Sequence, residues 1–304
     1  MTGAAAKKGG VMKKLAWGLN AAFAAPALLS GETSVAIAAE PKVIATKPQK
    51  VGNGWARVYV TLDADGSALA LGVSLDKAAL EGLPKDPDPT SRCFDKNGNG
   101  KMDEHECIGD YPFIFTLPEG EAAKAVAPFK WVSVNWNPHG HHIPPAPPPW
   151  AVPHFDFHFY IAEREAVKML RPGKCGELLD CEDFKKATKE VPAKYVHRDH
   201  INVDAAVPDM GNHLINSKAP ELAKNGPPFT HTFIFGAYDG RITFLEPMIT
   251  RAYLVSNPSM CMDIKQPEAW EVAGSYPTKY CVRYLDRAGR YTVSLEGFVQ
   301  HPAK

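Results

Sequence analysis

The residues best suited to chemistry lie together in the middle of the chain, where His154, Asp156 and His158 alternate with phenylalanines. Successive side chains of an extended strand point to opposite faces, so these three polar groups share one face and the phenylalanines share the other. Imidazole and carboxylate groups that face the same way can bind a metal ion, while the apolar face fills a core. A metal site is therefore the first functional hypothesis.

Two histidines four residues apart on a strand are separated by about 13 Å, so His154 and His158 do not share one ion unless the strand bends or begins after Pro153. Other ligands must come from other segments. The full set of transition-metal candidates is His139, His141, His154, Asp156, His158, His213 and Glu246, with His197, His200 and His231 outside it. Zinc, copper, iron or manganese would suit these ligands. The alternative is a histidine-lined cleft without a permanent ion.

A second metal motif occupies residues 95–106, which satisfy the calcium-loop pattern D-x-[DN]-x-[DN]-G-x5-E at every fixed position. Calcium takes six to eight oxygen ligands. The pattern supplies them from Asp95, Asn97, Asn99, the backbone carbonyl of Lys101, Asp103 and Glu106. The segment resembles an EF-hand loop, but prolines precede it and a strand pattern follows it. A lone structural loop clipped by Cys93 and Cys107 is predicted, and an acidic turn without a metal is the alternative.

The N-terminus has the pattern of an export signal. Four lysines precede an apolar stretch at 15–29, and small residues offer a cleavage point near Ala38. A signal peptide over 1–38 is therefore predicted, with a membrane anchor as the alternative. Its removal takes four of the 34 basic and one of the 34 acidic residues, leaving 30 and 33. The mature chain is then expected to be periplasmic or secreted, with no membrane span and no nucleic-acid partner.

The cysteine pattern fits such an exported chain. Six cysteines form three sequential pairs, each enclosing a short segment. Among the 15 pairings that six cysteines allow, the favoured one joins Cys93 with Cys107, Cys175 with Cys181, and Cys261 with Cys281. A thiolate metal site is the competing interpretation, weakened by the lack of a C-x-x-C motif.

Strand and hairpin patterns dominate the remaining sequence. Runs at 55–62 and 68–73 flank a turn that contains Asp and Gly, and similar pairs follow nearer the C-terminus. A mainly β fold is predicted, an antiparallel sandwich or barrel-like sheet with short helices, classed as β-rich α+β. The proline-rich segment 138–153 is expected to be a stiff extended loop that holds His139 and His141.

The expected organisation is a linker at 39–50 and a single β-rich domain at 51–304. That domain carries the calcium-loop insertion at about 84–110. A division into two domains near Leu170 is the weaker alternative, because the hairpins on both sides look like parts of one sheet system.

An ordered set of motifs resembles a bacterial domain family of unknown function. They lie at 136–141 (with HGH), 153–160 (PHFDFHFY), 208–213 (with MG-x-H), 238–241 and 246–250 (EPMIT). The structural prototype of that family is a homodecameric thermophile protein under sigma-factor and anti-sigma-factor control. The resemblance covers roughly residues 50–255. It implies a β-rich fold and a homo-oligomer, but no reaction, and it points to the same histidine, Asp156 and Glu246 positions.

These patterns favour an exported metal-binding protein with a structural calcium loop. One alternative is a metal-dependent hydrolase or oxidoreductase acting on a small molecule, with Glu246 or Asp156 as the general base. In that case Trp136, Trp150 and Phe155 would form an apolar wall for the ligand. The other alternative is a calcium-stabilised oligomer without a transition metal. The absence of G-x-S-x-G, a glycine-rich phosphate loop and H-E-x-x-H disfavours other enzyme classes.

Overall fold

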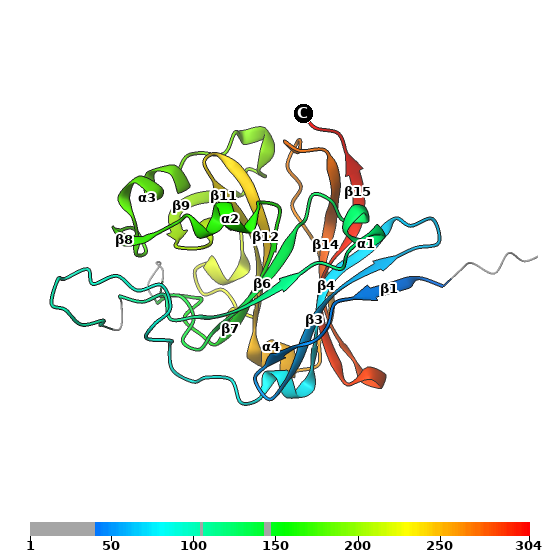
Figure 1. Ribbon diagram of the computed structural model, residues 1–304, viewed down its shortest axis with the longest axis horizontal. Helices are drawn as coiled ribbons and strands as arrows, with labels where there is room; N and C mark the ends of the chain where they lie inside the picture. Colours follow the sequence, from blue (N-terminus) through cyan, green and yellow to red (C-terminus); the bar gives the residue numbers. More distant parts are fainter. Residues whose placement is uncertain (1–39, 104–105, 143–146) are drawn as a thin grey trace, which may run out of the picture. The chain divides into compact units, whose positions relative to one another are not determined.

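Two antiparallel sheets, each of seven strands, face one another in the computed structural model, which describes residues 40–103, 106–142 and 147–304. The predicted signal peptide lies outside the described residues. The first sheet has the order β1-β3-β4-β15-β14-β13, with β2 paired to β3, and the second has the order β5-β6-β7-β12-β11-β10-β9. This arrangement confirms the predicted β-rich sandwich (Figure 1).

The strands of the first sheet are β1 (Lys42–Ala45), β2 (Gln49–Val51), β3 (Gly54–Leu62), β4 (Ala68–Asp76), β13 (Ser259–Asp263), β14 (Gly274–Leu285) and β15 (Arg290–His301). Those of the second are β5 (Tyr111–Thr116), β6 (Trp131–Asn137), β7 (His154–Tyr160), β9 (His200–Val207), β10 (Gly211–Asn216), β11 (His231–Tyr238) and β12 (Arg241–Thr250), and β8 (Pro172–Cys175) lies apart from both sheets.

The helices are short, as predicted. They are α1 (Glu121–Ala125), α2 (Arg164–Lys168), α3 (Cys181–Ala187), α4 (Arg251–Val255) and the 3-10 turns η1 (Lys77–Leu80), η2 (Ala193–Tyr195), η3 (Pro220–Leu222) and η4 (Asp286–Ala288). In Figure 1, α2, α3 and β8 lie on the side of the second sheet that faces away from β3, β4 and β14.

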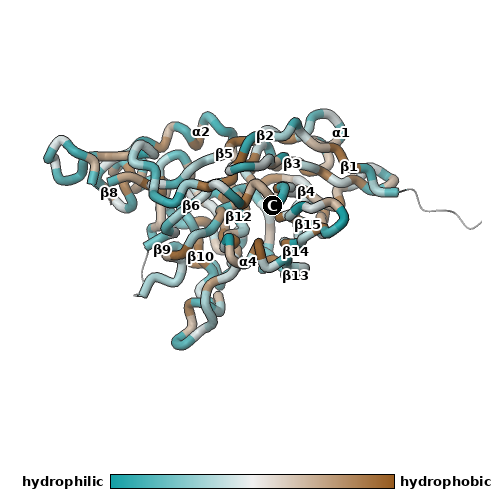
Figure 2. The backbone as a smooth tube through the Cα atoms, turned by 90° about the horizontal axis from the view of Figure 1, so that it is seen from below, coloured by the Kyte–Doolittle hydropathy of each residue, from teal (hydrophilic) through white to brown (hydrophobic). Residues whose placement is uncertain are grey.

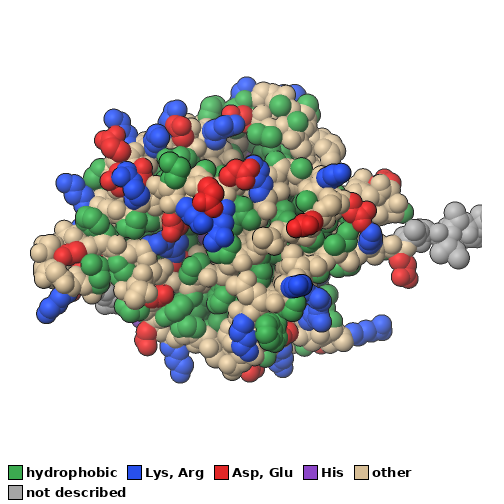
Figure 3. Space-filling model, in the orientation of Figure 1, with side chains coloured by type: hydrophobic (Ala, Val, Ile, Leu, Met, Phe, Trp, Pro, Cys, Tyr) green, Lys and Arg blue, Asp and Glu red, His purple; other side chains and the backbone are tan. Residues whose placement is uncertain are grey.

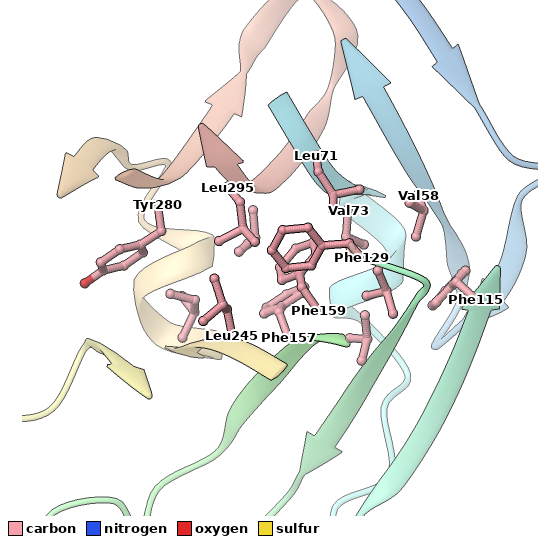
Figure 4. Packing of buried hydrophobic residues seen from close by; sticks show 14 of the residues in the cluster. Val58, Leu71, Val73, Phe115, Phe129, Phe157, Phe159, Leu245, Tyr280 and Leu295 are labelled. Carbon is pink, nitrogen blue, oxygen red and sulfur yellow. The ribbon is translucent and has the colours of Figure 1, made fainter. Parts of the chain in front are cut away.

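The core lies between the inner faces of the two sheets. Phe157 and Phe159 of β7 are fully buried and meet Leu71, Val73 and Leu295 of the first sheet (Figure 4). Hydrophobic stretches coincide with strands, while outlying turns are hydrophilic (Figure 2). Because the phenylalanines of β7 point inward, its alternate residues must point to the outer face of the second sheet. The core therefore fixes where the histidines of β7 face.

The segments expected to be a linker, an insertion and a loop differ in how much regular structure they contain. The segment 39–50, expected to be a linker, instead includes β1 and the first two residues of β2, and both strands pair with β3. The short alternation of residues around Pro48 was too brief to signal strands, but the free edge of β3 provides their backbone partners. In the described parts of the insertion at 84–110 and of the loop at 138–153, the backbone forms neither helix nor strand.

All six cysteines form disulfides, and their pairing is the predicted one. Cys261 and Cys281 stand opposite each other in the β13–β14 register. The thiolate-site interpretation is therefore wrong, and the proximity of Glu296 to this disulfide does not make a metal site. No helix in the described part of the chain has the length and apolarity needed to span a membrane. Acidic and basic side chains are interspersed over the face shown in Figure 3.

Candidate metal centre

The polar face of β7 is buried although it lies on the outer side of its sheet. His154, Asp156 and His158 are each at most 2% exposed. Strand β7 runs between β6 and β12, so these side chains stand near the middle of the sheet face with neighbours on both sides. Loops and the short elements after β7 cover that face. Three ionisable groups are thus removed from water on one strand, an arrangement that costs free energy unless they find partners.

The first group of ligand-type side chains brings together three strands. His158 of β7, His213 of β10 and Glu246 of β12 place their ligand atoms within 4.8 Å of one another. The Nε2 atoms of His158 and His213 lie 3.6 and 3.7 Å from the two carboxylate oxygens of Glu246. The Nδ1–H of His213 donates to the carbonyl of Ala205 at 2.9 Å, which leaves its Nε2 lone pair directed at the group.

The second group combines β7 with the proline-rich loop. His141, His154 and Asp156 also place their ligand atoms within 4.8 Å of one another. His154 Nε2 lies 3.1 Å from Oδ1 of Asp156, and His141 Nε2 lies 3.2 Å from Oδ2. The Nδ1–H of His154 donates to the carbonyl of Val152 at 2.7 Å. His154 and His158 therefore belong to different groups, in agreement with the distance expected along a strand.

The loop that carries His141 closes tightly on the chain before β7. The backbone N–H of His141 donates to the carbonyl of Trp150 at 3.0 Å. Gly140, just before it, has a φ of +72°, and a Cβ there would stand 2.1 Å from the same carbonyl. Only glycine fits this close approach, so Gly140 is what allows His141 to reach Asp156.

Several atoms of the two groups have no hydrogen-bond partner among the described protein atoms. They are Nε2 of His154, Oδ1 of Asp156, both ring nitrogens of His158 and Oε2 of Glu246, all buried. His154 Nε2 and Asp156 Oδ1 are close but do not have the angles of a hydrogen bond. Buried polar atoms are nearly always paired, so their concentration here needs an explanation. A cation bound by these lone pairs would supply one.

Burial sets the protonation states of the first group. It lowers the pKa of His158 to about 3 and that of His213 to about 4, so both rings are neutral at pH 7. Neutral imidazole is the form that binds metals. Burial, with the nearby charge of Asp156, raises the pKa of Glu246 well above its usual value. A bound cation would therefore have to displace a proton from Glu246.

Asp156 behaves differently from Glu246 although both are buried. Burial favours its protonated form, but the adjacent His154 and His141 together bring its pKa well below the usual value. The Nδ2 of Asn137 also donates to its Oδ2 at 2.7 Å. Asp156 is thus an ionised carboxylate beside a carboxyl group that resists ionisation. Environments that shift the pKa values of two neighbouring carboxyl groups in opposite directions are typical of functional sites.

A cavity of about 340 Å³ opens in front of the second group. His141, Asp156 and His213 line it, together with apolar side chains that include Trp150 and Met248. His139 also lines this cavity but is exposed and joins neither group.

The expectation of an apolar wall made by three aromatic residues is only partly right. Trp150 does line the cavity, whereas Trp136 and Phe155 point into the core between the sheets. Both stand on strands at positions whose side chains face inward, one on β6 and one on β7. The alternation of each strand assigns them to that face.

A polar row on β6, not predicted from the sequence, supports β7. Ser133, Asn135 and Asn137 stand directly opposite His158, Asp156 and His154 in the β6–β7 register, and all three are buried. The signal was present in the alternation of apolar and polar residues from 132 to 137, which has the same two-residue period as β7. Buried polar residues on a neighbouring strand are the natural partners of buried ligands.

An aromatic side chain also supports the first group. The ring of Phe244 on β12 lies 4.9 Å from that of His158 and 5.2 Å from that of His213, measured between centroids. Gly236 on β11 makes room for it, because a Cβ at Gly236 would stand 2.1 Å from the Phe244 ring. Packing of Phe244 thus restrains both imidazole rings.

The other histidines considered from the sequence have protein partners elsewhere. Nδ1 of His231 lies 2.9 Å from the hydroxyl of Tyr280, and Nε2 of His200 lies 3.3 Å from the carbonyl of Phe233. His197 lies at the start of the segment that leads into β9, near Asp199. None of the three belongs to a ligand group among the described residues.

The described residues of the calcium-type loop turn its acidic side chains inward. Asp95 accepts backbone N–H groups from Gly98, Asn99 and Gly100. Oε1 of Glu106 accepts those of Lys96 and Asn97, which closes the loop across its two ends. The amide groups of Asn97 and Asn99 both donate to Oδ2 of Asp103. Residues 104 and 105 lie outside the description.

Comparison of the chain with known proteins finds no matching family model, no matching curated protein and no matching solved structure. The two groups of side chains are therefore the basis for a functional conclusion.

Proposed function

We propose that this protein binds a divalent transition metal through His158, His213 and Glu246. The observation that carries the proposal is the convergence of three ligand-type side chains, of which His158 and Glu246 are buried and His213 is half-buried. Both ring nitrogens of His158 and Oε2 of Glu246 lack hydrogen-bond partners among the described residues. Two histidines with one carboxylate form a set used for zinc and for iron in proteins, and three protein ligands leave a coordination position for another molecule. Copper and manganese are the other candidate ions.

The second group, His141, His154 and Asp156, has the same composition and is proposed as a second metal position. Its support is the orientation of His154 by Val152 and of Asp156 by Asn137, contacts that hold ligand atoms in place. Because Asp156 and His158 are alternate residues of one strand, the two positions are neighbours on the same face.

Metal content per chain tests both positions. The full chain is treated with a chelator, reloaded separately with zinc, copper, iron or manganese, and analysed by mass spectrometry of the elements. We expect the double variant His158→Gln with Glu246→Gln to lose the ion of the first group. The double variant His154→Gln with Asp156→Asn should lose the ion of the second group. His200→Gln removes a buried histidine outside both groups and should keep the wild-type content. Folded variants that all keep the wild-type content would contradict the proposal.

The physiological role proposed is metal binding or storage outside the cytoplasm. The predicted signal peptide and the three disulfides support this location, because disulfides persist in oxidising compartments. The resemblance described above adds the proposal of a homo-oligomer. Light scattering coupled to gel filtration tests the oligomer, and mass measurement of the chain recovered after export tests cleavage near Ala38.

A metal-dependent enzyme is the second candidate function, favoured by the cavity of about 340 Å³ beside the two groups. Asp156, which lines the cavity and stays ionised, is the residue placed to accept a proton from water or substrate. Burial and the nearby charge of Asp156 instead raise the pKa of Glu246, and its protonated form cannot act as the base considered for it. Turnover of small esters, amides or phosphates by the metal-loaded protein, lost in Asp156→Asn, would support this candidate.

We also propose that the loop at 95–106 holds a structural calcium ion. Its support is the complete ligand pattern and the inward turn of Asp95, Asp103 and Glu106. Calcium should raise the unfolding temperature of the wild type but not of Glu106→Gln, while Glu119→Gln, a change of an exposed glutamate, should respond like the wild type. An equal response of all three proteins would contradict a site in this loop.

A further inference from the structure

A buried arginine stands beside the histidine groups with part of its guanidinium unused. The Arg92 side chain is 10% exposed, and its Nη2 donates to the fully buried carboxylate of Asp110. Its Nη1 makes a long contact of 3.5 Å with the carbonyl of Pro208. Its Nε, also buried, has no hydrogen-bond partner among the described protein atoms. A buried N–H of a charged group is costly to leave unpaired, which suggests a ligand.

Arg92 lines a second, smaller cavity of about 180 Å³ on the same sheet face. Ser133, Asn135 and Tyr160 also line it, and Arg164 and Lys168 contribute two exposed cations from α2. Lys168 pairs at the surface with Glu165, whereas Arg164 forms no ion pair with the described residues. Asp209 is the one carboxylate among the described residues that line the cavity.

The backbone at Arg92 is held in an unusual conformation. Its φ is +49°, in the left-handed region that residues other than glycine rarely adopt. The conformation is fixed on both sides, because Ser91 accepts the backbone N–H of Ile108 and Cys93 is bonded to Cys107. Such conformations persist only where surrounding contacts impose them, and they gather at ligand sites. The insertion thus serves to place this guanidinium against the sheet.

The smaller cavity adjoins the first histidine group. Ser133 is the cross-strand partner of His158, and the rings of Tyr160 and His158 have centroids 5.8 Å apart. Met210 lines both this cavity and the larger one. A group bound in this cavity would therefore lie on the same sheet face as the first histidine group.

We propose that the Arg92 cavity is a binding site for the oxyanion group of a small molecule, a carboxylate or a phosphate. An arginine guanidinium beside a cavity lined by further cations recognises such oxygens through charge-assisted hydrogen bonds. The site differs from the metal groups in its source of positive charge, which is the chain's own side chains and not a bound ion. The larger cavity lies beside the site, because Met210 lines both.

Calorimetric titration of the chelator-treated full chain tests this proposal without any metal. Inorganic phosphate and acetate are the probes, and acetamide is the uncharged control. We expect at least one anion to bind and acetamide not to bind, and the tighter anion identifies the preferred oxygen group. Failure here leaves the metal proposal standing, since no metal is present, and the metal analysis above can fail independently.

Two variants locate the binding. Arg92→Lys keeps a cation for Asp110 but removes the Nε–H, and it should weaken the tighter anion about tenfold or more. Arg164→Gln with Lys168→Gln changes only exposed side chains and should weaken it about threefold at low salt. Lys77→Gln with Lys124→Gln, exposed lysines elsewhere, should have no effect. Absence of anion binding, or equal binding to all variants, overturns the proposal. If Arg92→Lys fails to fold, the variant Arg164→Gln with Lys168→Gln decides by whether its anion binding is weaker than that of the wild type.

Discussion

At the scale of single residues, the candidate centre is defined by what restrains each ring. His154 and His213 donate through Nδ1 to backbone carbonyls, and this selects the tautomer whose Nε2 lone pair is free. His158 has no such donor contact and is held instead by the aromatic rings of Tyr160 and Phe244. Ligands fixed before the metal arrives lose little conformational entropy on binding, so we expect tight binding at these groups.

Asn137 is the residue whose loss should affect one group and not the other. Its Nδ2 donates to Asp156 at 2.7 Å, so Asn137→Ala frees the carboxylate to rotate. We expect metal affinity at the His141–His154–Asp156 group to fall by about tenfold, the usual effect of losing such a support. Competition with a coloured chelator measures the affinity. Gln300→Ala, an exposed change on the other sheet, is the control, and equal affinities in both variants would refute the supporting role.

His200 predicts a pH dependence of stability. Burial lowers its pKa from 6.5 to about 4, so between these values the unfolded chain binds more protons than the folded one. Its contribution to stability is complete above pH 6.5 and is lost as the pH falls toward 4, by about 1.4 kcal/mol per pH unit. In metal-free protein, His200→Gln should flatten the decline in unfolding free energy between pH 6.5 and pH 4.5.

Urea denaturation at several pH values measures this slope. Because His158 and His213 are also buried in the neutral form, part of the decline should persist in His200→Gln. Gln300→Ala, an exposed change of a side chain that does not titrate, is the control and should leave the slope unchanged. An identical slope in His200→Gln and the wild type would show that His200 is not the group that titrates.

At the scale of elements, the two-residue period of a strand predicts which side chains share a face of the sheet. It does not predict which strands pair with each other. The alternation in β7 correctly separates Phe155, Phe157 and Phe159 from the polar residues between them. It cannot show that β12 pairs with β7, a contact between segments more than eighty residues apart, because long-range pairing depends on the whole sheet. The meeting of Glu246 with His158 and His213 therefore had to come from the structure. The polar row of β6 was within reach of the sequence.

Gly236 on β11 is the element-scale position that controls the first group. A methyl group there would stand 2.1 Å from the ring of Phe244, which packs on His158 and His213. We expect Gly236→Ala to lower the free energy of unfolding by about 1–3 kcal/mol, as overpacking does. We also expect weaker metal binding at the first group, because the displaced ring shifts both histidines.

The matched control is Gly72→Ala on β4. A Cβ at Gly72 would come within 2.8 Å of Tyr59 and Ser294, so that variant should also be destabilised, but in the other sheet. Denaturation and metal titration of both variants separate the two effects. If both glycine variants lost metal affinity equally, general loosening of the fold would explain the change and Phe244 would not.

At the scale of the whole molecule, the sandwich divides two tasks between the faces of one sheet. The inner face of the second sheet completes the core, while its outer face carries the ligand groups and both cavities. The insertion contributes Pro87, Cys107 and Ile108 to the larger cavity and Arg92 to the smaller one. A segment with little regular structure therefore borders both cavities, and its stability should influence binding at each of them.

We expect the disulfide Cys93–Cys107 to stabilise the insertion and to support calcium binding by the loop within it. It joins residues 14 apart, and its removal in Cys93→Ser with Cys107→Ser should cost about 3 kcal/mol of stability through the entropy of the unfolded chain. Calcium affinity should also fall, because the bond holds together the two ends of the loop at 95–106. The double variant Cys175→Ser with Cys181→Ser removes a disulfide between residues six apart. It should lower the free energy of unfolding by about 2 kcal/mol without changing calcium affinity. Urea denaturation and calcium titration of both variants decide the matter, since equal calcium affinities would show that the loop is held closed by its own hydrogen bonds alone.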